Sequence, residues 1–266
     1  MTFELLISTM HKTLDEVKKM ISDMNIHCNC LVINQCDEEM FYEELIDKTF
    51  YMRVFCTRER GLSRSRNMAI KYAKAEIVCI ADDDLYYYND FDKVVLKYYE
   101  NNKDADIVLF NVDDYSKTFS PTNHNTNFFE LLSFISFQCS FKLESIKSNN
   151  IYFNELFGSG SQNFSSGEEN ILLTTCYKNR LKIKYCSDKI LKREESESTW
   201  FTSFNDKKFI MDRGAIFYAI DKIFYYPFTL YFAIKYYKKL KPYNFFQSIK
   251  IMRQGKKKYL SIIKNK

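Results

Sequence analysis

Short apolar runs alternate along this chain with longer stretches in which apolar residues recur every three or four positions. The runs are rich in β-branched residues, which is typical of strands that are covered on both faces. The intervening stretches have the spacing of helices that bury one side. Strands that alternate with helices indicate parallel β-α-β units. The pattern therefore predicts an α/β fold whose mixed, mainly parallel sheet is flanked by helices.

The strand pattern fits residues 5–7, 31–33, 51–56, 77–81, 107–112, 137–141 and 183–185. The helix pattern fits residues 15–24, a helix that Ser63 caps and that continues through Ala73, a helix that Asp90 caps and that ends at Glu100, and a helix that begins near Glu168. Ser and Asp are preferred caps because their oxygens accept hydrogen bonds from first-turn N–H groups. Residues 113–127 are polar and predict a loop.

Three carboxylates, Asp82, Asp83 and Asp84, directly follow the strand expected at residues 77–81. Adjacent acids repel one another, so the cluster is costly unless a cation or solvent screens it. In an open α/β sheet, ligands bind in the crevice at the carboxyl ends of the strands. Hard oxygen ligands at that place suit Mg²⁺ or Mn²⁺ that holds a phosphate. Taken alone, an acidic triplet after a strand is more often a solvated turn or a helix cap.

The helix expected from Ser63 supplies the opposite charge. Arg64 and Arg66 lie in its first turn, beside backbone N–H groups that a helix start leaves free. Such a helix start is a natural anion site. We favour Arg66 as the anion ligand, although both arginines also fit an ordinary charged surface. A helix start with arginines and a strand end with aspartates would hold an anion and its metal together.

The order of these two pieces resembles the donor-binding core of family 2 glycosyltransferases of the GT-A fold. Gly-Leu-Ser-Arg-Ser-Arg-Asn at 61–67 is similar to the family's nucleotide-facing helix start, and Asp-Asp-Asp at 82–84 is similar to its Asp-x-Asp motif. The resemblance covers roughly the first three-quarters of the chain. It implies the GT-A fold and a bacterial surface-polysaccharide enzyme. The Gln-x-x-Arg-Trp signature of processive synthases is missing, which implies a non-processive member.

The resemblance further implies a metal-dependent, inverting transfer of a sugar from a nucleotide diphosphate, with a UDP-sugar preferred. The acceptor would be a hydroxyl of a glycan or a lipid-linked saccharide in capsule, O-antigen or exopolysaccharide synthesis. Mn²⁺ or Mg²⁺ would be held mainly by Asp84, together with Asp82, which also faces the ribose. The donor-binding residues that the resemblance implies are Thr9, Gln35, Gly61, Ser63, Arg66, Asp82, Asp83 and Arg213.

Gly-Glu-Glu-Asn at 167–170 opens the last expected helix of the catalytic region. Two acids in a first helical turn suit the macrodipole, which is the simplest interpretation. The stretch also resembles the family's Gly-Glu-Asp element, whose second acid is the general base in inverting members. That resemblance assigns the base to Glu169 and leaves Glu168 as the alternative. In relatives a mobile lid covers the diphosphate, and Ser198, Thr199 and Arg213 are candidates for it.

Composition agrees with one globular catalytic domain and adds a cellular expectation. The chain has 266 residues, of which 46% are hydrophobic and 17% aromatic, with only 6 Gly and 3 Pro. These values argue against disorder and against a disulfide scaffold. The 8 Cys lack paired zinc-finger spacing, which favours reduced thiols in a cytosolic protein. No signal peptide is visible at the N-terminus.

The charge is uneven, and this separates a catalytic domain at residues 1–215 from an extension at 216–266. The formal net charge is +5, yet no acidic residue follows Asp221, whereas lysines alternate with aromatics to the end. Asp221, Lys222 and Pro227 disfavour a membrane-spanning helix. We expect an amphipathic helical segment on an anionic membrane, and hence a cytoplasmic enzyme peripheral to the inner face of a bacterial membrane. Contact with the catalytic domain or a homodimer interface is the alternative.

Two other classes of protein compete with this interpretation. A nucleotidyltransferase shares an α/β core and a metal site, but it usually carries a Gly-rich basic loop after the first strand. Here that place holds Ser-Thr-Met-His-Lys-Thr at 8–13, which disfavours it. A non-catalytic membrane-surface binder would rely on the basic tail alone. Nucleic acid is disfavoured as a partner because nearly all acids lie in the front of the chain and no binding motif is present.

Overall fold

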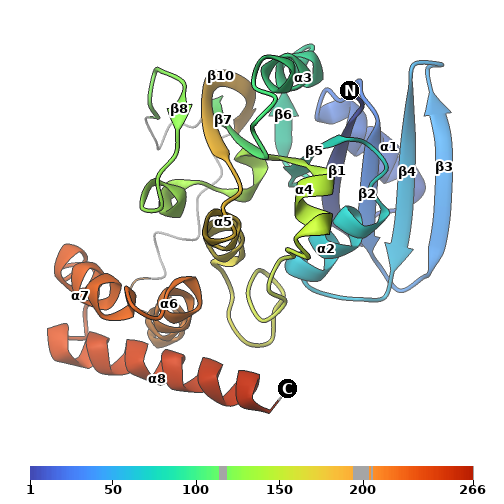
Figure 1. Cartoon of the computed structure of the whole chain (residues 1–266). Coiled ribbons are helices and arrows are strands. Elements are labelled where there is room, and N and C mark those ends of the chain that lie inside the picture. Colours follow the sequence, from blue (N-terminus) through green and yellow to red (C-terminus); the bar gives the residue numbers. More distant parts are fainter. Residues whose placement is uncertain (114–118, 194–203, 205, 266) are drawn as a thin grey trace.

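The computed structural model describes residues 1–113, 119–193, 204 and 206–265. Its strands are β1 Phe3–Met10, β2 Cys30–Gln35, β3 Met40–Ile46, β4 Phe50–Thr57, β5 Ile77–Ala81, β6 Leu85–Tyr87, β7 Ile107–Asp113, β8 His124–Asn125, β9 Cys139–Lys142 and β10 Ile183–Arg193. Over the described residues they form one ten-stranded sheet in the order β3-β4-β2-β1-β5-β9-β7-β10-β6, with β8 beside β10 (Figure 1). Neighbours β4, β2, β1 and β5 are parallel, as are β7 and β10, so the expected mainly parallel sheet is confirmed.

Helices cover both faces of this sheet. They are α1 Leu14–Asp23, α2 Leu62–Tyr72, α3 Phe91–Asn101, α4 Leu143–Ser148 and α5 Glu168–Lys178, with short 3₁₀ turns η1 Glu130–Ser133 and η2 Ser136–Gln138. Leu5 and Ile7 of β1 join the core under α1 and α3, whereas Leu6 joins the core under α2, α4 and α5. Successive residues of a strand point to opposite faces, so only a continuous apolar run can fill both cores.

The strand register brings the expected site residues to one edge. Thr9 pairs with Asn34 and Met10 with Gln35 between β1 and β2, and Ile7 pairs with Ala81 between β1 and β5. The ends of these parallel strands therefore lie together, and the acid triplet that follows Ala81 emerges beside them. This is the edge at which ligands bind in open α/β sheets.

Several expected elements differ in detail. The cap of α2 is Gly61, not Ser63, and Ser63 is already inside the helix. Asp90 stands at the start of α3 as expected, but its backbone is left-handed and its side chain caps nothing; instead it pairs with Lys93 at 2.7 Å. The strand expected at 137–141 is η2 followed by β9, and the short strand expected at 183–185 continues to Arg193.

In the last described stretch, residues 206–265, three helices pack together below the sheet (Figure 1). They are α6 Lys207–Ile220, α7 Tyr225–Lys235 and α8 Phe245–Lys264. A Cβ on Gly214 of α6 would lie 1.8 Å from the Met252 carbonyl oxygen, and a Cβ on Gly255 of α8 would lie 1.7 Å from that of Met211. Only glycine permits so close a crossing. Among the described residues, no helix has both the length and the apolar character needed to cross a membrane.

Candidate active site

Gly61 fixes the start of α2 against the end of β2. Its backbone has φ 117°, a conformation that favours glycine, and its N–H donates to Gln35 Oε1 at 2.6 Å. Gln35, expected to contact the donor, therefore holds the helix start with its amide oxygen. The next residue, Leu62, donates its N–H to the Ser159 carbonyl at 2.9 Å, which joins a distant loop to the same point.

Ser63 has a structural contact that its expected role did not include. Its hydroxyl is buried and donates to the Phe157 carbonyl oxygen at 2.6 Å. A Cβ on Gly158 would lie 2.9 Å from Ser63 Oγ, so the loop passes very close to the helix. Ser63 thus ties α2 to the loop that leads into α5, and it does not cap the helix.

Arg66 is the centre of the site. Only 2% exposed, it donates from Nη2 to Asp82 Oδ1 at 2.7 Å and to Ser136 Oγ at 2.7 Å, and from Nη1 to Glu168 Oε1 at 3.0 Å. A buried charge is tolerated only when it is paired and hydrogen-bonded. One guanidinium therefore joins the acid triplet to the start of α5. Both of its terminal nitrogens donate hydrogen bonds to the protein.

The other two acids of the triplet differ from Asp82. Asp83 accepts from Thr9 Oγ1 at 2.5 Å and lies 3.6 Å from the Lys12 Nζ. Asp84 is exposed; partial desolvation and the neighbouring charges of Asp82 and Asp83 raise its pKa, while Arg193 opposes them. A carboxylate crowded by like charges is a place where a cation is favourable.

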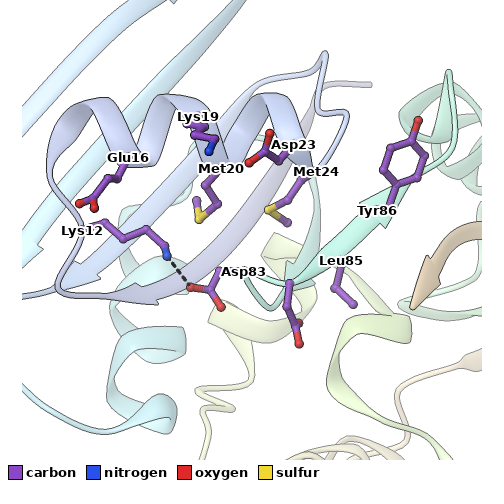
Figure 2. A pocket seen from close by; sticks show the side chains of 10 residues that line it. Lys12, Glu16, Lys19, Met20, Asp23, Met24, Asp83, Leu85 and Tyr86 are labelled. Atoms are coloured by element: carbon purple, nitrogen blue, oxygen red, sulfur yellow. Dashed lines mark ion pairs between the residues drawn. The ribbon is translucent and has the colours of Figure 1, made fainter. Parts of the chain in front are cut away.

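A cavity of about 500 Å³ opens between α1 and the triplet (Figure 2). Figure 2 shows Lys12 reaching toward Asp83, while Met20 of α1 and Met24, which directly follows α1, project on the side of the acids. Lys12 also lines a second cavity of about 410 Å³ at the ends of β2 and β4, together with Asn34 and Asp37. The two hollows meet at Lys12, on the edge where the parallel strands end.

Glu168 and Glu169 open α5, as expected. Gly167 precedes them with φ 90°. A Cβ added at this position would lie 2.7 Å from the Ile216 side chain, so this turn requires glycine. Glu168 is buried against Arg66. Burial, with the added charge of Glu168, raises the pKa of Glu169 to about 8, and Arg66 and Arg213 oppose the shift. A carboxyl group with a pKa near neutrality is suited to accept a proton in catalysis.

Helix α6 completes this part of the site. Asp212 is buried and accepts from the Ser165 N–H at 2.9 Å, the Ser165 hydroxyl at 2.8 Å and Lys208 Nζ at 2.8 Å. Arg213, a residue expected in the lid, lowers the pKa of Glu169 through its positive charge. Its guanidinium carbon Cζ lies 4.6 Å from the ring centroid of Phe209. Arg213 therefore lies near Glu169. The other expected lid residues, Ser198 and Thr199, lie outside the described residues.

Sequence reasoning missed Lys12, Ser136 and Asp212. Lys12 carried a signal, because a basic residue two positions after the end of β1 faces the same edge as the acids. Ser136 carried none, and Asp212 was overlooked although it directly precedes Arg213. Among the described residues, no group of three His, Cys, Asp or Glu side chains forms a metal site of its own. Asp82 and Asp84 still fit the ion, because Mg²⁺ is commonly held by one or two carboxylates plus substrate phosphates.

A known family model and two solved structures are similar to this chain. Residues 8–163 match the family model described as Glycosyl transferase family 2. No curated protein sequence is significantly similar to the chain. The structure is similar to S. aureus TarS 1–349, alone and in complex with UDP-GlcNAc, with a TM-score of 0.60 and 14% identity over 98% of this chain and 92% of that chain.

A second solved structure is similar over nearly the whole chain. It is the mannosyltransferase PcManGT from Pyrobaculum calidifontis in complex with GDP-Man and Mn²⁺, with a TM-score of 0.54 and 11% identity over 99% of this chain and 74% of that chain. At these identities the likeness shows the fold, and it is the GT-A fold that the motifs implied.

Proposed function

Since this chain belongs to glycosyltransferase family 2 and is a glycosyltransferase, we propose that it moves a sugar from a nucleotide-diphosphate donor to an acceptor hydroxyl with inversion. The observation that carries the proposal is the buried guanidinium of Arg66, which pairs with Asp82 on one side and Glu168 on the other. The donor motif and the base motif thus form one cluster. Family membership overturns the nucleotidyltransferase and the non-catalytic binder as alternatives.

The two cavities suggest how the donor lies. We place the nucleoside at the ends of β1 and β2, near the hollow that Lys12 shares with Asn34, and the diphosphate beside Asp83 and Asp84. The UDP and UDP-GlcNAc complexes of TarS support a UDP-sugar, and the GDP-Man and Mn²⁺ complex of PcManGT supports a metal. Asp84 and Asp82 would hold Mn²⁺ or Mg²⁺, which when bound stabilises negative charge on the leaving diphosphate.

Glu169 acts as the general base in this proposal. Its carboxylate removes the proton of the acceptor hydroxyl while that oxygen bonds to the anomeric carbon and the bond to the diphosphate breaks on the opposite face. A single displacement of this kind inverts the configuration. Arg66 pairs with the Glu168 carboxylate at 3.0 Å, which favours Glu169 as the acid of the pair that serves as the base. Arg213 sets the charge around it.

The acceptor is proposed from the family resemblance: a glycan or lipid-linked saccharide of a bacterial surface polysaccharide. A lipid-linked acceptor requires the enzyme to work at a membrane surface, and residues 216–266 are the part of the chain that we propose for that contact. A homodimer through the same residues is the competing proposal.

The test is to replace Glu169 by Ala and to measure transfer and donor binding separately. Transfer from the preferred nucleotide sugar, found by a panel screen with Mn²⁺, should fall by about 10²–10⁴-fold, the usual contribution of a positioned base. Donor affinity should stay near that of the unmodified protein. Glu100→Ala removes an exposed acid at the end of α3 and is the control. Undiminished transfer in Glu169→Ala would remove this residue from the mechanism.

A further inference from the structure

The outer side of α7 is apolar although it faces solvent. The inner side packs Tyr225, Thr229, Phe232 and Ala233 into the helical bundle. The opposite side, with the residues directly flanking the helix, exposes large apolar side chains, which we call the α7 outer face: Ile223, Tyr226, Leu230, Tyr231, Ile234 and Tyr237. Ile223 is 84% exposed and Ile234 66%. Tyr226, Leu230 and Ile234 recur every four residues and therefore share one side of the helix.

Helix α8 of the same bundle shows what a solvated helix looks like in this protein. Its exposed positions are mainly polar or basic, at Arg253, Gln254, Lys257, Ser261 and Lys264. Single exposed apolar residues are ordinary on protein surfaces, but a contiguous group of them marks an interaction site. A helix that is apolar on every side is normally covered by protein or lipid. The α7 outer face therefore has a partner.

The charges around this face indicate which partner. Between residues 222 and 241 there are five lysines and no acidic residue. Lys222 precedes α7, Lys235 lies in its last turn and Lys238 follows it, and all three are exposed. Lys235 Nζ lies 5.2 Å from the ring centroid of Tyr231. Tyrosines and lysines around an apolar stripe are the composition of helices that lie in the interface of anionic membranes.

We infer that the α7 outer face docks on an anionic lipid bilayer, with its apolar side chains at the boundary of head groups and acyl chains and its lysines on the lipid phosphates. A two-fold contact with a second copy is less favourable, because the same surface patch would meet itself and bring the lysines together. The inference deepens the proposed function, since it supplies the surface from which a lipid-linked acceptor reaches the site. Helix α7 packs on α6, which carries Asp212 and Arg213 to the base.

The experiment is flotation of the full-length protein with vesicles of phosphatidylcholine alone or mixed with phosphatidylglycerol. We expect binding to the mixed vesicles that weakens at high salt, and little binding to phosphatidylcholine. Tyr231→Ser with Ile234→Ser should lower the affinity for mixed vesicles more than tenfold, and Lys235→Ser about fivefold. Ile263→Ser, an equally apolar exposed residue near the end of α8, is the control and should bind like the unmodified protein.

Each outcome is decisive for the docking surface. Equal vesicle binding by the double variant and the control, or no binding by the unmodified protein, overturns the inference. A dimer of the unmodified protein that the double variant dissociates, without vesicle binding, identifies a second copy as the occupant. Transfer to a soluble acceptor should be unchanged in the double variant. Glu169→Ala protein should still bind vesicles, so failure of the proposed chemistry is distinguishable from failure of docking.

Discussion

A guanidinium as deeply buried as that of Arg66 needs acids to balance it, and here it has two. Asp82 follows β5, and Glu168 opens α5. The two ion pairs therefore join segments that are 86 residues apart in the sequence. Removing one partner of a buried ion pair leaves an uncompensated charge, which costs far more than the intact pair contributes. Arg66 therefore acts as a positioning residue for both motifs.

Arg66→Met is expected to lower the free energy of unfolding by about 3–5 kcal/mol, because Glu168 and Asp82 lose their common partner. Arg64→Met is a matched control on the same helix. Arg64 pairs with Glu155 at 3.3 Å, but the two side chains are 50% and 45% exposed, and such a pair contributes only about 0–1 kcal/mol. Urea unfolding measures both variants. Equal stabilities for the two would show that the buried pairing is not what holds the site.

The raised pKa of Glu169 predicts how activity depends on pH. Below a pKa of about 8 most Glu169 is protonated and cannot accept a proton, so transfer should increase with pH up to that region. The same shift has a stability consequence: the folded state favours the protonated form, so this contribution is present at low pH and is lost as pH rises from 4.5 through about 8. The change in transfer rate and the change in stability both follow from protonation of Glu169.

Arg213→Met should move the rising limb of the pH–rate profile to higher pH, because Arg213 lowers the pKa of Glu169. Arg213→Lys restores the charge and should move the limb back. Arg64→Met removes an exposed charge and should leave the profile in place. Initial rates from about pH 6 to pH 9 provide the measurement. A limb that stays fixed in Arg213→Met would contradict the assignment of Glu169 as the titrating base.

At the scale of single residues, sequence motifs identified the acidic residues but not the side chains that contact them. Asp82 and Glu169 stood out because motifs place them directly after a strand and at a helix start. The partners of Arg66 could not be predicted, since Ser136 comes from a 3₁₀ turn that no periodic pattern marks. Ser63 was mistaken for a cap because serine is favoured there, whereas the close approach of Gly158 demands a small buried hydroxyl at that position.

At the scale of elements, fully buried strands were predictable, whereas the helix caps and the edge of the sheet were not. Residues 77–81 are a strand as expected, because a strand covered on both faces must be continuously apolar. Strand β3 was missed since it is half exposed and contains Glu43 and Glu44. Its turn gave no signal either: Asp47 and Lys48 have φ 46° and 59°, a conformation usually announced by Asn or Gly.

The crossing of α6 and α8 gives a prediction about an element as a whole. Gly214→Ala would place a methyl group on the Met252 carbonyl, so the two helices must separate. Overpacking of this kind costs about 1–3 kcal/mol, and the melting temperature should fall by about 2–12 °C. Because α6 also carries Asp212 and Arg213, transfer should fall too. Differential scanning fluorimetry and an activity assay provide the measurements.

Ser261→Ala is the control for this crossing. It places alanine at an exposed position of α8, away from the contact, where the change should be within about 0.5 kcal/mol. A melting temperature for Gly214→Ala that equals the control would mean that the helices tolerate a wider separation. In that case α6 would not be fixed relative to the base by this contact.

For the whole molecule, helices α6 and α8 both contact the loop that precedes Glu168. Asp212 of α6 holds Ser165, and Lys258 of α8 donates to the Asn163 carbonyl at 3.0 Å, so both helices grip the loop before Glu168. The boundary expected after residue 215 falls inside α6. Periodicity showed that the tail has apolar faces, but it could not show which face meets the loop, because periodicity does not report contacts between segments that are distant in the sequence.

Binding of the donor nucleotide together with its metal should be measurable as a change in the stability of the whole chain. UDP with Mn²⁺ at one hundred times the dissociation constant should stabilise the fold by about 2.7 kcal/mol, which raises the melting temperature of a chain this size by about 5–10 °C. Chelation with EDTA should remove most of that shift, because Asp83 and Asp84 then repel the diphosphate. Asp84→Asn should respond little to Mn²⁺, whereas Asp90→Asn, an exposed acid paired with Lys93, should behave as the unmodified protein. If UDP raised the melting temperature equally in EDTA and in Asp84→Asn, donor binding would need no metal. The assignment of Glu169 as the base would then still be tested separately by the pH–rate profile.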